Sequence, residues 1–107
     1  MTVIAELSLD LAGTTQKVTV RLFAPEELKD GPGWRCRYEI GEPISHDQDI
    51  YGEWSLQALM LALKGLSSDL YGSDEYKEGR LGIEGQFGGY LGIPAPNVFL
   101  NQAPYPF

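Results

Sequence analysis

The sequence contains only one cysteine and one histidine, which limits the chemistry that it can carry. A transition-metal site draws on several cysteine or histidine ligands, and a nucleophilic cysteine needs a base beside it. No histidine or pair of acids stands at such a spacing around Cys36, so we interpret Cys36 as a small packed hydrophobe. A single thiol forms no internal disulfide. We therefore expect no cofactor, no metal and no enzyme activity.

Long apolar runs and an N-terminal basic segment are also absent. A membrane-spanning helix needs about 20 consecutive apolar residues, and a secretory signal begins with positive charge. The first residues, Met-Thr-Val-Ile-Ala-Glu, carry no base and place Glu6 where a signal would be apolar. We expect a cytoplasmic protein that does not enter a membrane.

Positive charge is scarce and unevenly spread. The chain has 8 Lys and Arg residues against 15 Asp and Glu, for a net charge of -7, and residues 85–107 carry no charge at all. Nucleic acids and anionic lipids repel such a domain, so we expect neither as a partner. A protein with a basic surface fits the charge, and the alternative is that the acidity only keeps the protein soluble.

Alternation of apolar and polar residues predicts three strands, over about residues 2–11, 16–23 and 34–41. In the first strand the alternation places five apolar side chains on the buried face: Val3, Ala5, Leu7, Leu9 and Leu11. The turn residues between the first two strands predict a hairpin in which Glu6 and Asp10 face Lys17 and Arg21. The stretch from Ala24 to Gly33 is expected to be a polar connection.

One helix, over about residues 53–71, organises the rest of the chain. Six apolar side chains fall on one arc of a helical wheel, and we expect this arc to lie on the strands: Leu56, Leu59, Met60, Leu63, Leu66 and Leu70. Gly72 is expected to end the helix in a left-handed conformation. The opposite arc carries small residues beside Trp54, and we expect part of residues 85–107 to fold over it: Ala58, Ala62 and Gly65.

These elements predict one domain, residues 1–107, of the α+β class. Its core would be an antiparallel three-stranded meander packed on one central helix. Residues 81–93 contain five glycines, which favours one or two short strands joined by a turn after residue 80. The uncharged, Gly- and Pro-rich segment 85–107 would dock on the body of the domain.

The segment from Gly41 to Gly52 is the one place where a metal or acid–base site can be considered. Asp47 and Asp49 form an Asp-x-Asp pattern beside His46. A calcium loop starting at Asp47 would need a bidentate glutamate at its twelfth position, where Ala58 stands. We therefore expect His46 to be a solvated loop residue, and the pair of carboxylates is the only route to an enzyme.

The helix resembles the central helix of a known protein family. The resemblance rests on Ser55-Leu56-Gln57-Ala58-Leu59, on Leu61-Ala62-Leu63, and on Leu70-Tyr71 followed by Ser73-Asp74-Glu75-Tyr76. It runs from Ile4-Ala5-Glu6 to Ile93-Pro94 and is to a family of short bacterial proteins described only as a domain of unknown function. The family usually has an acid directly before the Ser-Leu-Gln-Ala-Leu motif, where this chain has Trp54. The resemblance implies no catalytic residues.

Our hypothesis is a small acidic binding protein, most concretely an immunity protein that neutralises a bacterial toxin. The candidate partner-binding residues are acids and tyrosines around the helix: Asp47, Asp49, Glu53, Tyr71, Asp74, Glu75, Tyr76 and Glu78. The protein would be a monomer or a homodimer. Two alternatives stay open, namely a structural subunit of a homo-oligomer and, less favoured, a small enzyme that uses a carboxylate pair.

Overall fold

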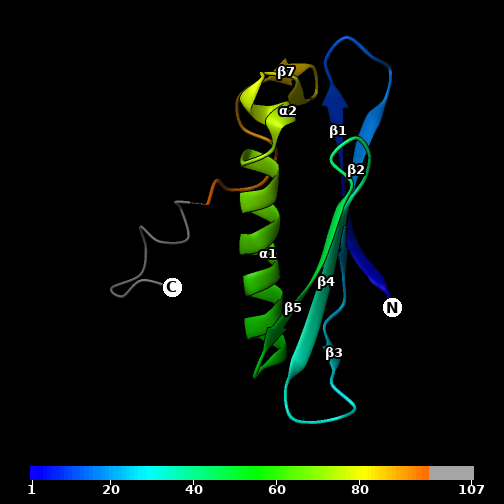
Figure 1. Ribbon diagram of the computed structural model, residues 1–107, viewed down its shortest axis with the longest axis vertical. Coiled ribbons are helices and arrows are strands. Elements are labelled where there is room, and N and C mark those ends of the chain that lie inside the picture. The colour runs from blue at the N-terminus through cyan, green and yellow to red at the C-terminus, as the bar shows by residue number, and fades with distance from the viewer. Residues whose placement is uncertain (97–107) are drawn as a thin grey trace.

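The computed structural model describes residues 1–96, which form one antiparallel sheet packed against one long helix (Figure 1). The strands are β1 (Val3–Leu11), β2 (Lys17–Phe23), β3 (Glu26–Glu27), β4 (Trp34–Ile40), β5 (His46–Gly52), β6 (Leu81–Ile83) and β7 (Gln86–Phe87), and the helices are α1 (Ser55–Tyr71) and α2 (Asp74–Lys77). The α+β class with one main helix is confirmed. The described sheet has seven strands, so the three-stranded meander is not confirmed.

The sheet has the strand order β3-β4-β2-β1-β6-β7, and β5 pairs with β4. Helix α1 packs against β4 and β5, and in the described part of the chain no helix lies on the other face of the sheet (Figure 1). The described residues therefore form two layers and leave one face of the sheet open. None of the described helices has the length and apolar character needed to cross a membrane.

The β1–β2 hairpin has the predicted register. Glu6 lies opposite Arg21 and Asp10 lies opposite Lys17. Both pairs form ion pairs, with 3.6 Å between Arg21 Nε and Glu6 Oε1. Cys36 is fully buried, and its Sγ lies 3.3 Å from the carbonyl oxygen of Phe23, as expected of a packed thiol.

Strand β5 was not predicted, because residues 42–52 were interpreted as a loop. This strand pairs with β4 along its whole length, and its outward side chains include Asp47 and Asp49. With few apolar side chains it shows no hydrophobic alternation, so the pattern that reveals β1 and β2 is missing. Placing His46 in a solvated loop was wrong, since this residue lies in β5 and is half-buried. The short elements β3 and α2 were missed as well.

The orientation predicted for α1 is correct only in part. Four of the six side chains of the predicted arc are buried or pack against the core: Leu59, Leu63, Leu66 and Leu70. Ala58 and Ala62 are fully buried, whereas Leu56 and Met60 are exposed. A Cβ atom added to Gly65 would lie 3.2 Å from the hydroxyl oxygen of Tyr38, so the small residues bring the helix close to β4. The hydrophobic wheel gives weight to leucine and little to alanine and glycine, which explains the error.

Gly72 does end α1, but not in the predicted conformation. Its φ is -90°, which lies outside the left-handed region. A side chain would be excluded there for another reason, because a Cβ atom on Gly72 would lie 2.7 Å from the carbonyl oxygen of Ser68. The glycine is required by this close approach.

The described part of the uncharged C-terminal segment, residues 85–96, does not cover the residues for which the segment was predicted. The side chain of Trp54 is 71% exposed, and Ala58 and Ala62 pack in the core between helix and sheet. Phe87 and Tyr90 are exposed too. Leu91 to Pro94 instead contact the last turns of α1, where Ser67 Oγ donates to the Pro94 carbonyl at 2.6 Å. The part of the prediction that concerns residues 97–107 lies outside the described residues.

Candidate functional site

Three carboxylates, two of them among the predicted partner-binding residues, gather around one arginine on the open face of the sheet. Arg37 Nε donates to Glu39 Oε2 at 2.9 Å and its Nη1 lies 3.4 Å from Asp49 Oδ1, while Nη2 contacts Asp47. The hydrogen bond to Glu39, with those to Asp49 and Asp47, raises the pKa of Arg37. Asp47 and Asp49 are therefore partly neutralised by a structural ion-pair network.

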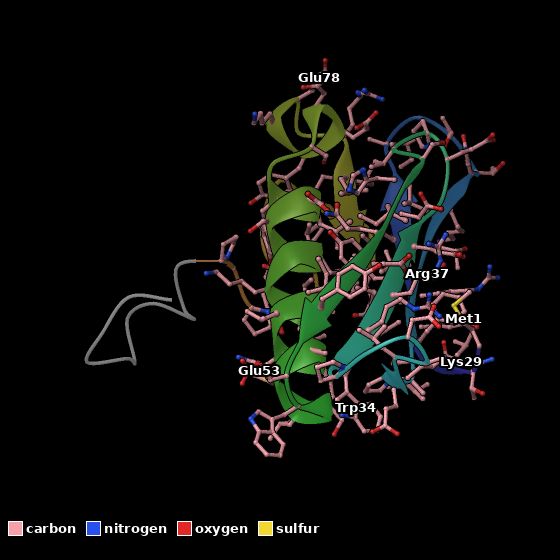
Figure 2. All side chains as sticks on the ribbon, turned by 60° about the horizontal axis from the view of Figure 1, so that its bottom comes forward. Met1, Lys29, Trp34, Arg37, Glu53 and Glu78 are labelled. Atoms are coloured by element: carbon pink, nitrogen blue, oxygen red, sulfur yellow. The ribbon has the colours of Figure 1, made fainter. Side chains whose placement is uncertain are left out.

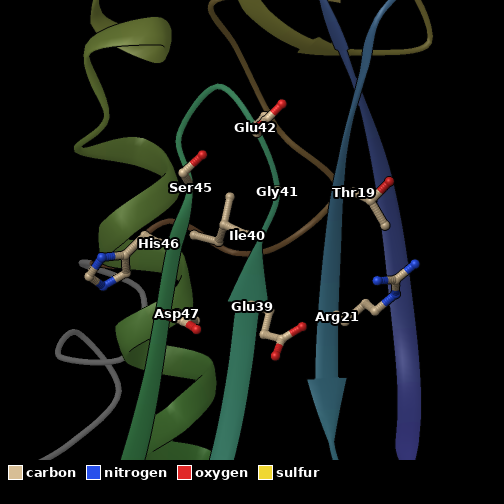
Figure 3. Close-up of a pocket in the computed structure, with 9 residues that line it drawn as sticks. All are labelled: Thr19, Arg21, Glu39, Ile40, Gly41, Glu42, Ser45, His46 and Asp47. Atoms are coloured by element: carbon tan, nitrogen blue, oxygen red, sulfur yellow. The ribbon is translucent and has the colours of Figure 1, made fainter.

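A hollow of about 380 Å³ lies beside this network, at the turn between β4 and β5 (Figure 3). Its lining includes Arg21, Glu39, Glu42 and Asp47. Figure 3 shows His46 on the side of β5 nearer to α1, pointing away from these carboxylates. Arg21, Glu39 and Asp47 have ion-pair partners within the chain. The residues that line this hollow offer neither a nucleophile with its base nor a ligand shell.

On the helix side of the sheet, Asp69 joins Tyr38 and His46. The Tyr38 hydroxyl donates to Asp69 Oδ2, and His46 Nε2 lies 3.1 Å from the same oxygen. Burial, with the hydrogen bond to the Asp69 carboxylate, raises the pKa of the Tyr38 hydroxyl. The protonated hydroxyl of Tyr38 joins α1 to the sheet through this hydrogen bond. It is a poor general acid or base at neutral pH.

A serine hydroxyl beside this group is already engaged in hydrogen bonds. Ser73, which lines a hollow with His46 and Asp69, donates to the Leu70 carbonyl at 2.7 Å and accepts the amide proton of Tyr76 at 3.2 Å. Its role is to cap α2. In the described part of the chain no group of three or more His, Cys, Asp and Glu side chains is placed to hold a metal ion.

The two tyrosines predicted to contact a partner instead contact residues 88–93. Tyr71 donates its hydroxyl proton to the Ile93 carbonyl at 2.7 Å and accepts the Leu91 amide at 3.0 Å. Tyr76 packs edge-on against Tyr71, with 5.0 Å between ring centroids. Both side chains are only partly exposed, and their contacts give them a structural role.

The remaining predicted acids do not form one surface with the Arg37 network. Asp74 and Glu75 begin α2, and Glu78, which follows it, forms an ion pair with Arg80. Figure 2 shows Glu53 and Glu78 at opposite ends of the molecule. The eight predicted residues are thus spread over the open sheet face and both ends of the helix layer.

An exposed aromatic surface lies at the start of α1. Of the residues that form it, only Glu53 was predicted to bind a partner. Tyr51 and Trp54 are 58% and 71% exposed and line a hollow of about 660 Å³. We name the following residues, all of which line it, the Trp54 surface: Leu28, Pro32, Tyr51, Glu53 and Trp54. The exposed side chains of Leu56 and Met60 follow in the first two turns of α1.

Trp54 occupies the N-cap position of α1, where Ser, Thr, Asp or Asn would stabilise the helix. Its side chain makes no capping hydrogen bond. Gln57 partly compensates, because its Oε1 accepts the backbone N–H of Glu53 at 2.7 Å. An apolar side chain at a position that favours a polar one was the signal in the sequence that could have indicated this surface.

A family model described as "Domain of unknown function (DUF6968)" matches residues 5–95 of the chain. The match agrees with the expected resemblance to a family of unknown function. No curated protein and no solved structure matches the chain.

Proposed function

The chain belongs to the DUF6968 family, whose function is unknown, and we propose that it is a small binding protein that neutralises a protein partner. The observation that carries the proposal is the Trp54 surface. Tryptophan and tyrosine are enriched at the energetic centres of protein interfaces, because each buries a large area at low entropic cost. Two such side chains, both more than half exposed beside a hollow, are suited to that role.

The charge of the chain supports a basic partner. Glu53 stands within the Trp54 surface, and the whole sequence carries a net charge of -7. A long-range negative field accelerates the approach of a basic protein, and apolar contacts at the centre of an interface then slow its dissociation. The acids of α2 and of the open sheet face add to this field without touching the partner.

The most concrete form of this proposal is a cytoplasmic bacterial immunity protein that inhibits a toxin. The size and acidity of the chain support it. A second candidate, a subunit of a homo-oligomer, is favoured by the exposed apolar half of β1.

Affinity capture tests the proposal. The immobilised protein is expected to retain one basic protein from a lysate of its source organism. Expressing that protein alone should arrest growth, and co-expressing the present chain should restore it. The proposal is wrong if no protein is retained, or if the retained protein is harmless when expressed alone.

Salt dependence gives an independent measure of the electrostatic part. The association rate with the isolated partner should fall as the salt concentration rises, and Glu53→Lys should slow association while reducing this dependence. An affinity that is equal at low and high salt would contradict a basic partner.

A further inference from the structure

Strand β1 is paired unequally along its two edges. On one edge it pairs with β2 from Val3 to Asp10. On the other edge it pairs with β6 only at Asp10 and Leu11, and no other described strand lies there. The N-terminal half of β1 therefore presents an open edge.

The direction of the free backbone groups follows from two hydrogen bonds. Ala12 N–H donates to the Arg80 carbonyl at 2.8 Å, on the β6 side. Because successive residues of a strand direct their backbone groups to opposite edges, Glu6 and Ser8 share the edge of Ala12. The Gly41 N–H donates to the Thr19 carbonyl, so the backbone groups of Thr19 point toward β4. Its neighbour Val20 therefore points toward β1, where it lies opposite Leu7. Leu7 is thus bonded to β2.

The first three side chains of this half-strand are apolar and exposed. Leu9 and Leu11 on β1 are buried, but Val3 and Ile4 are 39% and 50% exposed, and Ala5 is exposed as well. The prediction that Val3 and Ala5 face the core was therefore wrong. The pairing register with β2 shifts between Val3 and Ala5, so the regular part of the open edge runs from Ala5 to Leu9. It contains no proline or lysine, which commonly protect such edges.

Charge distinguishes this edge from that of β5, which pairs only with β4. Glu6, on the open part of β1, is paired with Arg21 of its own chain. On β5 and its neighbour, Glu39, Asp47 and Asp49 share the single base Arg37, which leaves an excess of negative charge. Two copies of β5 would repel each other, whereas two copies of β1 would not.

We propose that two copies of the chain pair through the open edge of β1, in antiparallel orientation about a two-fold axis. The backbone groups of Glu6 in one copy then bond to those of Ser8 in the other, and Ala5 of each copy lies opposite Leu9 of the other. The two sheets become one continuous sheet. The Trp54 surface takes no part in the pairing, so both copies keep it free for a partner.

The oligomeric state of the purified protein tests the pairing. A short edge gives a small interface, which is typical of weak association. The molar mass from light scattering should be near that of one chain at about 1 µM and approach twice this value at about 500 µM. A protein that stays monomeric at the higher concentration would overturn the proposal.

Proline at position 8 tests whether β1 is the interface. Proline is accepted on an edge strand where the N–H faces away from the sheet, so Ser8→Pro should fold and yet lack one intermolecular donor in each copy. We expect the dissociation constant of the Ser8→Pro dimer to be about tenfold or more higher than that of the Ser8→Ala dimer, which is the matched control. Equal dissociation constants would place the interface elsewhere and overturn the proposal.

Amide hydrogen exchange on the wild-type protein gives a readout that does not depend on the folding of a variant. The exchange of the Glu6 and Ser8 amides should slow as the concentration rises, because these amides become bonded only in the dimer. The exchange of the Leu7 amide, which is bonded to β2 in both states, should not change. If the molar mass doubles but the exchange of the Glu6 and Ser8 amides does not slow, pairing through β1 is contradicted.

Discussion

Asp10 joins segments that are far apart in the sequence. One carboxylate oxygen contacts Lys17 Nζ, and the other accepts the Gly85 N–H at 2.8 Å. The hydrogen bond from Lys17, with that from Gly85, holds the pKa of Asp10 below its ordinary value. A carboxyl group whose pKa is lower in the folded state stabilises the fold above its unfolded-state pKa and loses this contribution as the pH falls through the folded-state value.

Replacing Asp10 should therefore destabilise the protein in a pH-dependent manner. Asp10→Ala is expected to have a lower free energy of unfolding than the wild type at neutral pH, and the difference should shrink as the pH falls below about 4. Urea unfolding at several pH values measures the free energy of unfolding of both proteins and how their difference depends on pH. Ser8→Ala, on the same strand, is the control and should show no such trend. A constant difference at all pH values would contradict the role of the charge.

Gly65 lies where α1 approaches the ring of Tyr38 most closely, since a Cβ atom would lie 3.2 Å from the hydroxyl and 3.4 Å from Cε2. Gly65→Leu should overpack this contact and lower stability by about 1–3 kcal/mol. Ser68→Leu, on the exposed side of the same helix, is the control and should have little effect. Thermal unfolding compares them, and equal melting temperatures would show that the helix does not pack through Gly65.

At the scale of elements, the sequence predicted those that carry a hydrophobic pattern. β1, β2, β4 and α1 appear within a few residues of their predicted bounds. β5 was missed because its outward side chains are bound by Arg37 rather than buried, and such a network leaves no apolar alternation. The buried face of α1 was misjudged in part, because the burial of Ala58 and Ala62 depends on their small size, to which hydropathy is insensitive.

The Arg37 network is expected to hold β5 on β4. Arg37→Met removes the base that forms ion pairs with Glu39, Asp47 and Asp49, so these three carboxylates should repel one another. We expect a loss of about 1–2 kcal/mol at low salt, with a smaller loss at high salt. Arg21→Met, which breaks the single exposed pair with Glu6, should cost less than about 1 kcal/mol. If both variants are equally stable, the network has no special role.

For the whole molecule, the sequence predicted the sign of the charge but not the place where a partner could bind. The predicted acids and tyrosines lie at separate places, and several are occupied by contacts within the chain. The exposure of Tyr51 and Trp54 depends on how β5 meets α1, and neither the strand nor the full orientation of the helix was known from the pattern. The open edge of β1 likewise follows from the short length of β6.

The central claim is that the chain binds a protein through the Trp54 surface, and calorimetric titration with the captured partner tests it most directly. Trp54→Ala should weaken the affinity by about 30-fold or more, as expected for an interface centre. Tyr90→Ala removes an aromatic side chain of similar exposure from another part of the molecule and should leave the affinity unchanged. Equal affinities of the wild type and Trp54→Ala would contradict the account.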